Sequence, residues 1–281
     1  EGETEALRSP PLAGALRSVR EAGRRLAKGQ TVPEGAVLCA LQLVRTRRFS
    51  VAGHPMLVPV LDLLNHSFEP HVEVEPPDGD FVMFGAAAVG GDGADDAFRL
   101  RAARAARRGE ELTWEYCQDP NDLLLSTHGF VVPGNPFDRL VAQPAELRAA
   151  LTQLAEGSGA TGPLAEAKVS ELSRRLPDPG PPHEGQGLLV LERLGQAGPT
   201  WNPDWLELCW FMRLSGPGEP HWSKRQGGAA LLCAAVTEAV GFLVGPQAPS
   251  AEEERLLAGG GGGGLRAALD FRWEQARLVE A

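Results

Sequence analysis

The amino-acid sequence predicts an α+β fold with a helical insert, a core of short strands and an all-α C-terminal domain. Short extended segments separated by turns fill residues 49–138, a pattern typical of small irregular sheets. Beyond Asp138, apolar residues recur at helical spacing almost throughout. We therefore predict two domains, residues 1–138 and 139–281, with residues 1–48 as the helical insert of the first.

The insert is predicted to contain two helices. Residues 11–28 carry Leu, Val and Ala at helical spacing with several Arg residues between them, which indicates an amphipathic helix. Pro33 suits the first turn of a second helix over residues 33–48. The apolar stripe expected to be buried on that helix consists of Val37, Leu38, Leu41 and Val44.

The core of the first domain reads as short strands. Residues 71–75 and 80–84 alternate between apolar and polar side chains around a Pro-Pro-Asp-Gly turn, which favours a hairpin. Residues 98–102 and 111–116 are further extended candidates, and residues 121–126 resume a helical pattern that ends near Gly129. The helices predicted for the second domain cover residues 145–154, 164–176, 203–214, 226–244, 250–258 and 265–279.

Composition excludes several classes of function. A formal net charge of −10 argues against nucleic-acid binding, and no apolar run is long enough for a membrane helix. The four cysteines form no C-x-x-C pair, so we expect free thiols and no metal site. We also expect a monomer. Because the chain opens with Glu1 and shows no signal pattern, we interpret it as a fragment or a processed product.

Three motifs contain candidate functional residues. In Leu57–Ser67 an apolar run with Asp62 inside it ends in Asn65, His66 and Ser67. This motif is either a structural turn or a place where the backbone and Asn65 bind a polar small molecule. His66 alone is typical of a hydrogen-bonded core residue.

The second motif, Gly109–Tyr116, ends in the only tyrosine of the chain. Tyr116 is either the phenol of a reaction centre or a core aromatic whose hydroxyl group donates to a backbone carbonyl. The third motif is Asn121–Phe130 followed by Asn135–Asp138, and on its own it is a helix with a glycine stop and a turn.

In their order and spacing, these motifs resemble SET-domain protein methyltransferases of the Rubisco large-subunit methyltransferase type. The matching segments of the first domain are Thr46–Phe49, Asp62–Ser67, Gly109–Tyr116, Asn121–Leu125, His128–Phe130 and Asn135–Asp138. In the second domain they are Asn202–Arg213, Ser250–Leu257 and Arg272, which are similar to the substrate-binding domain of that family. The resemblance implies a knot-like catalytic fold of short strands at residues 49–138 and a helical substrate-binding domain at 139–281.

The resemblance also implies an activity, the transfer of a methyl group from S-adenosylmethionine to a protein side chain, usually lysine and in one branch histidine. Tyr116 is then the catalytic residue that orients the amine, and a lysine-containing protein is the partner. The cofactor-binding positions implied by the resemblance are Arg47, Asp62, Leu63, Leu64, Asn65, His66, His128, Gly129 and Phe130.

Three positions depart from the family pattern. No Gly-x-Gly cofactor loop precedes Asn65, and Gly185-Gln186-Gly187 imitates it at the wrong place. Cys117 stands where glycine is common, and His128 replaces an aromatic residue. We therefore expect the 281 residues alone to bind the cofactor weakly or not at all. The alternatives are a non-catalytic protein-binding module and a histidine methyltransferase on the same fold.

The methyltransferase hypothesis makes one geometric demand. The turn around Asn65 and the lone phenol of Tyr116 must fold against each other to frame a tunnel between the methyl donor and the acceptor nitrogen.

Overall fold

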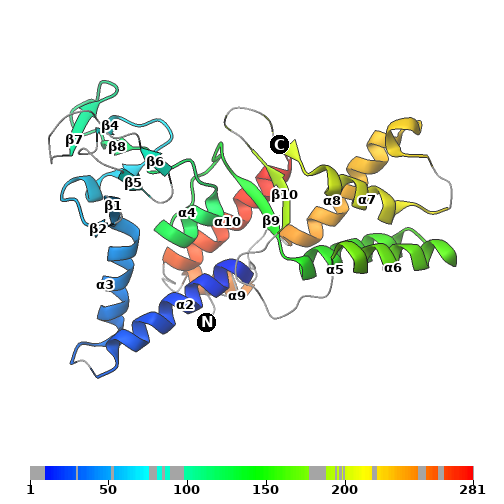
Figure 1. Cartoon of the computed structure of the whole chain (residues 1–281), viewed down its shortest axis with the longest axis horizontal. Helices are drawn as coiled ribbons and strands as arrows, with labels where there is room; N and C mark the ends of the chain where they lie inside the picture. The colour runs from blue at the N-terminus through cyan, green and yellow to red at the C-terminus, as the bar shows by residue number, and fades with distance from the viewer. Residues whose placement is uncertain are drawn as a thin grey trace. The chain divides into compact units, whose positions relative to one another are not determined.

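The computed structural model describes residues 10–29, 31–51, 54–75, 81–83, 86–88, 98–176, 188–193, 195, 198, 200–216, 220–245, 251–258 and 263–280. The chain forms two compact units. We call residues 18–119 the β-rich unit, and residues 1–17 together with 120–281 the helical unit. Figure 1 traces both units from blue at the N-terminus to red at the C-terminus. Within the described residues, no helix has the length and apolar character needed to cross a membrane.

The two helices predicted for the insert are confirmed as α2 (Pro10–Ala27) and α3 (Glu34–Arg47). They pack closely at Gly23, where a Cβ atom would lie 2.2 Å from Cδ2 of Leu38. An ion pair between Arg24 and Glu34, 3.2 Å apart, joins the two helices near the connecting turn. Glycine at position 23 is therefore what allows the two helices to approach.

The prediction that α3 buries an apolar stripe is wrong. No residue of α3 is buried, and Leu43 and Val44 expose about half of their surface, 51% and 46%. The physical reason is that α3 has few neighbours: Leu38 meets Gly23 of α2, and the C-terminal turn of the helix leads into the first strand. The apolar periodicity identified the helix correctly but did not predict how much of its surface is exposed to solvent.

The β-rich unit contains a four-stranded sheet in the order β2-β1-β5-β6, in which every neighbouring pair is antiparallel. Its strands are β1 (Phe49–Val51), β2 (His54–Met56), β5 (Phe81–Met83) and β6 (Ala86–Ala88). The predicted hairpin between residues 71–75 and 80–84 is not formed, because β5 pairs with β1 and β6 instead. The turn assigned to residues 76–79 lies outside the described residues.

Strand β4 (Val72–Glu75) instead pairs antiparallel with β7 (Arg99–Ala102). Charge complementarity explains this choice of partner. Glu73 faces Arg101 and Glu75 faces Arg99 in the register, and Arg101 also forms a 2.5 Å ion pair with Glu75. Opposite charges on facing strand positions stabilise a strand pair, whereas β5 contains no charged residue.

A short parallel pair joins distant parts of the β-rich unit. Strand β3 (Asn65–His66) runs beside β8 (Thr113–Trp114), with Asn65 opposite Thr113 and His66 opposite Trp114. The core beneath this pair consists of Phe49, Leu61, Val72 and Trp114. The rings of Phe49 and Trp114 stack at a centroid separation of 5.9 Å. This core fixes the positions of the segments that precede and follow the parallel pair.

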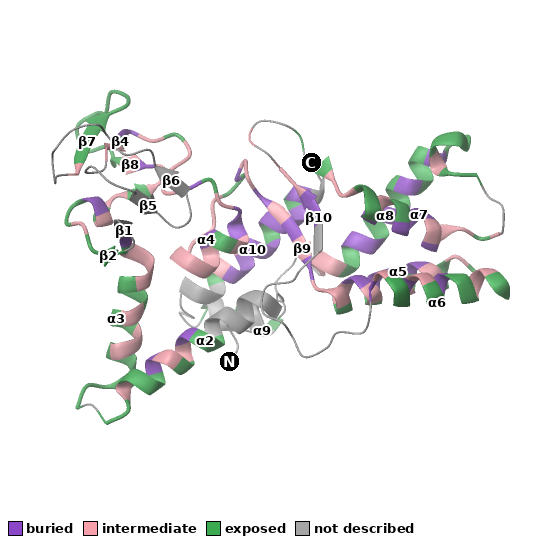
Figure 2. Ribbon diagram, viewed as in Figure 1, coloured by how far each residue is buried: buried purple, intermediate pink, exposed green. Residues whose placement is uncertain are grey.

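The helices predicted for the C-terminal region are present in the helical unit. They are α4 (Asn121–His128), α5 (Pro144–Gly157), α6 (Pro163–Arg175), α7 (Pro203–Arg213), α8 (Gly228–Val244), α9 (Ala251–Ala258) and α10 (Gly263–Glu280). Figure 2 marks buried positions on α5, α7 and α8, which pack against one another. Some of these helices begin at residues whose side chains cap the first turn. Asn202, for example, accepts from the backbone amide of Asp204 at 2.9 Å and begins α7.

The expected all-α character of the C-terminal domain is wrong. A three-stranded antiparallel sheet in the order β11-β10-β9 lies within it, formed by β9 (Arg139–Ala142), β10 (Leu188–Glu192) and β11 (Thr200–Trp201). Its residues Leu140, Ala142, Val190 and Leu191 join the core of the helices. These strands are too short for a distinct period-two pattern, so helical periodicity on both sides of them dominated the prediction.

A buried lysine connects three helices of this unit. Lys168 of α6 is 2% exposed. Its ammonium group donates to Ser158 Oγ at 2.6 Å, to the Met212 carbonyl at 2.7 Å and to the Leu214 carbonyl at 2.6 Å. The ammonium therefore satisfies backbone acceptors at the C-terminal end of α7.

The two compact units divide at Asp119–Pro120. Helix α4 packs against α10 and so belongs to the helical unit. The domain boundary predicted at residue 138 stays a prediction.

Candidate functional site

The parallel pairing of β3 and β8 brings the lone tyrosine against the Asn65 turn. The backbone N–H of Tyr116 donates to Nδ1 of His66 at 3.1 Å, and the phenol O–H donates to the carbonyl oxygen of Leu64. The two contacts join residues 50 and 52 positions apart in the chain. The predicted approach of these two segments is confirmed.

The contact with Tyr116 selects the tautomer of the neutral His66 ring. Because Nδ1 accepts a hydrogen bond, a neutral His66 carries its proton on Nε2, an assignment that follows from the hydrogen-bond network. The ring also packs edge-on against Phe68 at 4.5 Å and beside Tyr116 at 5.3 Å between centroids. His66 therefore holds the backbone of the tyrosine and one face of its ring.

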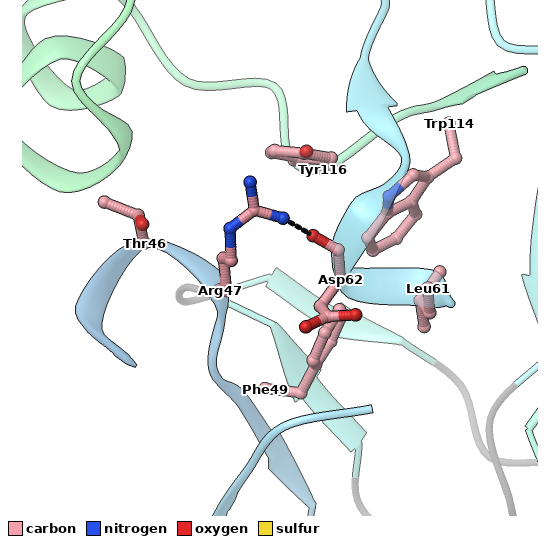
Figure 3. Close-up of a pocket in the computed structure, with 7 residues that line it drawn as sticks. All are labelled: Thr46, Arg47, Phe49, Leu61, Asp62, Trp114 and Tyr116. Atoms are coloured by element: carbon pink, nitrogen blue, oxygen red, sulfur yellow. Dashed lines mark hydrogen bonds between the residues drawn. The ribbon is translucent and has the colours of Figure 1, made fainter. Parts of the chain in front are cut away.

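Arg47 lies at the end of α3 and contacts the backbone of the Asp62 turn. Its guanidinium Nη1 donates to the carbonyl oxygen of Asp62, as Figure 3 shows. The turn is the 3₁₀ segment η1 (Leu61–Leu63), in which Leu61 is buried and Leu63 is 69% exposed. Leu61 therefore fixes the turn in the core while Arg47 ties it to α3.

The residue before this turn has an unusual backbone conformation. Val60 has φ 74° and ψ −50° and is the only residue other than glycine with positive φ among the described residues. A β-branched side chain disfavours this conformation, at a cost of about 1–3 kcal/mol. The cost is offset by the hydrogen bonds of the turn, in which the Asp62 amide donates to the Val58 carbonyl at 3.0 Å.

A hollow opens between these segments. It is open to solvent and is lined by Thr46, Arg47, Phe49, Leu61, Asp62, Trp114 and Tyr116. Figure 3 draws these side chains. Trp114 is 5% exposed, and its buried Nε1–H has no hydrogen-bond partner among the residues that the structure describes. A buried N–H without an acceptor costs free energy, so the guanidinium and the indole together suit a ligand that brings an acceptor or an anionic group.

Burial sets the ionisation of the groups beside the hollow. It raises the pKa of the Tyr116 phenol, an effect opposed by the Arg47 guanidinium and reinforced by the Glu111 and Asp62 carboxylates. The phenol is therefore neutral and acts as a donor at physiological pH. Burial, with the neighbouring Asp119, raises the pKa of the Cys117 thiol to about 12. Cys117 is thus a packed thiol rather than a nucleophile.

The side chain of Asn65 is held by a residue that the sequence did not single out. Its Nδ2 donates to Oε1 of Glu111 at 2.5 Å. Glu111 is part of the Gly-Glu-Glu run, but the sequence does not indicate that its carboxylate meets the Asn65 amide. One Nδ2 hydrogen is used on Glu111, so the second Nδ2 hydrogen, the side-chain carbonyl oxygen of Asn65 and the local backbone are the groups left to meet a ligand.

A hydrogen-bond network around His71 supports β8, the strand that precedes Tyr116. Nδ1 of buried His71 lies 3.1 Å from Thr113 Oγ1 and 3.3 Å from Arg104 Nη2, and its Nε2 lies 3.1 Å from Oε1 of Glu110. Since arginine only donates, Nδ1 accepts and Nε2 donates to Glu110. Hydrogen bonds from the Arg107 amide and from His71 lower the pKa of Glu110. This network keeps the loop before β8 in register with β4.

The remaining predicted positions lie in the helical unit, at the end of α4. Gly129 has φ 82° and ends the helix, its amide donating to the carbonyls of Leu124 and Leu125 at 3.1 Å each. The rings of His128 and Phe130 lie 5.7 Å apart. The structure thus gathers Arg47, Asp62, Leu64, Asn65, His66 and Tyr116 in the β-rich unit, and it places His128, Gly129 and Phe130 at one corner of the helical unit.

Sequence reasoning missed Leu61, which lines the hollow, and the orphaned indole N–H of Trp114. The aromatic run ending in Tyr116 was the available signal for Trp114, but a core role was the simpler interpretation. Among the described residues, no group of three or more His, Cys, Asp or Glu side chains is arranged to hold a metal ion.

Comparisons with known proteins give a similarity to solved structures. No protein-family model matches the chain, and a search of curated protein sequences found no match. Among solved structures, the chain is similar to one described as "Crystal structure of the SET domain of LSMT bound to Lysine and AdoHcy", with a TM-score of 0.45 and 18% sequence identity. The alignment covers 100% of this chain and 64% of that one, so the chain spans less than two thirds of the length of that protein.

Proposed function

We propose that the protein is an S-adenosylmethionine-dependent protein-lysine N-methyltransferase of the SET-domain type, with Tyr116 as its catalytic residue. The observation that carries the proposal is the seating of the Tyr116 phenol on the Leu64 carbonyl and of its backbone on His66. The family resemblance of the motifs requires that these two segments meet. The amino-acid composition of the two segments alone does not predict this contact.

The residues around the hollow fit part of the proposed cofactor. The guanidinium of Arg47 and the indole N–H of Trp114 suit a carboxylate or carbonyl group, and Phe49 and Leu61 supply apolar walls. Asp62, Leu63, Leu64, Asn65 and His66 would contact the cofactor through this turn. The motif resemblance implies cofactor contacts for His128, Gly129 and Phe130 as well. The cofactor supplies an electrophilic methyl group on a sulfonium, which no side chain of the protein provides.

The chemistry left to the protein is orientation and proton control. The Tyr116 O–H donates to Leu64, so the phenol oxygen keeps lone pairs that can accept an N–H of the incoming amine. Apolar walls from Trp114 and Phe49 disfavour the ammonium form of lysine and favour the neutral nucleophile. Holding the amine in line with the methyl group is worth roughly 7–11 kcal/mol in well-oriented reactions.

The test uses the intact protein, together with any residues encoded before Glu1, with methyl-labelled S-adenosylmethionine and candidate protein substrates, read by mass spectrometry of lysine and histidine side chains. We expect labelled lysine with the wild type and loss of at least about 100-fold of that activity in Tyr116→Phe. Labelled histidine instead would reassign the acceptor. No cofactor binding at millimolar concentration by calorimetry, with retained binding of a protein substrate, would replace the enzyme by a binding module.

A further inference from the structure

Positive charge is concentrated in one part of an acidic chain. Residues 18–48 hold seven basic and two acidic side chains, a formal charge of +5, in a chain whose total is −10. They belong to the β-rich unit, in which they form the C-terminal part of α2 and all of α3. The remainder of the chain therefore carries −15. Electrostatic attraction directs an acidic ligand to this segment and away from the rest of the chain.

Basic side chains line one face of the end of α2. Arg20, Arg24 and Lys28 follow one another at intervals of four residues, so they lie on the same side of the helix. Arg24 pairs with Glu34 of α3 at 3.2 Å. Arg25 and Lys28 are exposed, and neither has an acidic partner among the described residues. Like charges at this spacing destabilise a helix, and an acidic ligand would relieve that repulsion.

Exposed aliphatic side chains lie next to these charges. Leu26 follows Arg25 on α2 and exposes 55% of its surface, and Val32 in the turn to α3 exposes 49%. Figure 2 colours the turn between α2 and α3 mostly as exposed. Apolar side chains bordered by charged ones are typical of a surface that contacts another protein. We call Arg25, Leu26, Lys28 and Val32 the turn surface.

The packing of α2 disfavours a lipid membrane as the ligand. An amphipathic helix binds a membrane by inserting its apolar face. In α2 that face is already used inside the β-rich unit, because Val19 is 5% exposed and Gly23 packs against Leu38 of α3. The side chains of α2 that remain accessible next to the turn are mainly basic.

Charge and composition also disfavour a nucleic acid. Residues 18–48 contain no aromatic side chain on which a base could stack. A nucleic acid is a long polyanion, and the −15 on the remainder of the chain repels it. A short acidic segment of a protein avoids this repulsion, because it is small enough to contact the turn surface alone.

We propose that the turn surface binds a short acidic segment of a partner protein. Glu or Asp side chains of the partner pair with Arg25 and Lys28, and an aliphatic side chain of the partner packs against Leu26 and Val32. Exposed charges of this kind mainly govern the association rate and the choice of partner. The inference goes beyond the proposed methyl transfer and does not depend on it, because no residue of the turn surface lines the hollow.

The test measures the fluorescence polarisation of a labelled synthetic peptide of Glu-Glu-Leu repeats with the intact protein. We expect the wild type to bind it at least about tenfold more tightly than the same peptide with Gln in place of Glu, and binding to weaken as salt is added. In Arg25→Glu/Lys28→Glu, the dissociation constant of the acidic peptide should rise by about tenfold or more.

The control is Arg107→Glu/Arg108→Glu, which changes the net charge by the same amount at exposed positions between β7 and β8. Figure 1 places that turn at the other end of the β-rich unit from the turn between α2 and α3. The control should change the dissociation constant by less than about threefold, since distant exposed charges are screened. An equal loss in both double variants would overturn the inference, as would equal binding of the Glu and Gln peptides.

Other occupants of the turn surface give distinct results. Tighter binding of duplex DNA or of phosphatidylserine vesicles than of the acidic peptide would overturn the proposal. A wild-type dimer that Arg25→Glu/Lys28→Glu dissociates in analytical ultracentrifugation would assign the surface to a second copy of the chain instead. If that variant fails to fold by circular dichroism, Arg25→Gln/Lys28→Gln takes its place, because it puts no acid near the C-terminal end of a helix. Failure of both to fold would make the two residues a requirement of the fold and contradict the proposal.

Discussion

The backbone N–H of Tyr116 donates a 3.1 Å hydrogen bond to Nδ1 of His66, across 50 residues of sequence. This bond exists only while Nδ1 carries a lone pair. It fixes the orientation of the His66 ring relative to the backbone of Tyr116. The phenol is then directed to the Leu64 carbonyl. The position of the lone tyrosine is thus set by His66, which lies opposite Trp114 in the parallel strand pair.

Replacing His66 tests whether this acceptor matters. In His66→Leu the acceptor is lost, and the half-buried amide of Tyr116 is left without its partner, at a cost of about 1–3 kcal/mol in the free energy of unfolding. In His66→Asn, Oδ1 occupies nearly the place of Nδ1, so most of that stability should return. Urea unfolding of the two variants measures the difference. Equal destabilisation in both would show that ring packing, not the hydrogen bond, is the contribution of His66.

The pKa of Tyr116 can be read directly, because it is the only tyrosine in the chain. Burial raises this pKa and Arg47 lowers it. Titration of the near-ultraviolet phenolate absorbance should therefore give a value above 10.0 in the folded protein, and a still higher value in Arg47→Met. A lower pKa in Arg47→Met than in the wild type would mean that the guanidinium does not act on the phenol.

Asp138 predicts a distinctive dependence of stability on pH. Burial raises its pKa from 3.8 to about 6, against the hydrogen bonds from Asn121 and Arg139 that lower it. For a raised pKa the contribution to stability is fully present below 3.8 and is lost as the pH rises through about 6. A rise of this size corresponds to about 3 kcal/mol.

The corresponding measurement compares urea unfolding of the wild type and Asp138→Asn on both sides of that window. The variant has no carboxylate to ionise, so its stability relative to the wild type should increase by about 3 kcal/mol as the pH rises through the window. A difference that stays constant with pH would show that the Asp138 carboxylate titrates at its ordinary pKa.

Two glycines of α8 predict opposite responses to alanine. At Gly228 a Cβ atom would lie 2.0 Å from the carbonyl oxygen of Trp222, a backbone atom that cannot move aside cheaply. We expect Gly228→Ala to lower the free energy of unfolding by about 1–3 kcal/mol. A Cβ atom at Gly241 would meet no atom of the described residues within 4 Å outside its own stretch of helix, so Gly241→Ala should stabilise the helix by up to about 1 kcal/mol. Chemical denaturation checks both, and two changes of the same sign would contradict the packing at Trp222.

Local patterns predicted the elements of this protein and some of their ends. Apolar residues at helical spacing located α2, α3 and α5 to α8, because each helix shows its period within a few turns. Gly129 predicted the end of α4, since glycine adopts the left-handed conformation without steric cost. The order of the motifs also indicated that the Asn65 turn and Tyr116 act together.

Long-range pairing was not predictable from those patterns. The partner of β4 is β7 and not the nearer β5, and β9 to β11 form a sheet between helices. Short strands carry too few residues to specify a partner, so charge and core packing select it after collapse. The burial of Lys168 and the positive φ of Val60 also depend on neighbours that are distant in the sequence or on the closing of one turn.

The sequence by itself determined the helices, the glycine stop after α4 and the identity of the chemical groups available, because these depend on residues close together in the chain. Tertiary structure decided what those groups meet: the phenol of Tyr116 on the Leu64 carbonyl, the Asn65 amide on Glu111, and Asn121 on Asp138. The physical reason is that hydrogen-bond partners are chosen by proximity in space. Proximity across 17 to 52 residues follows from how the whole core packs.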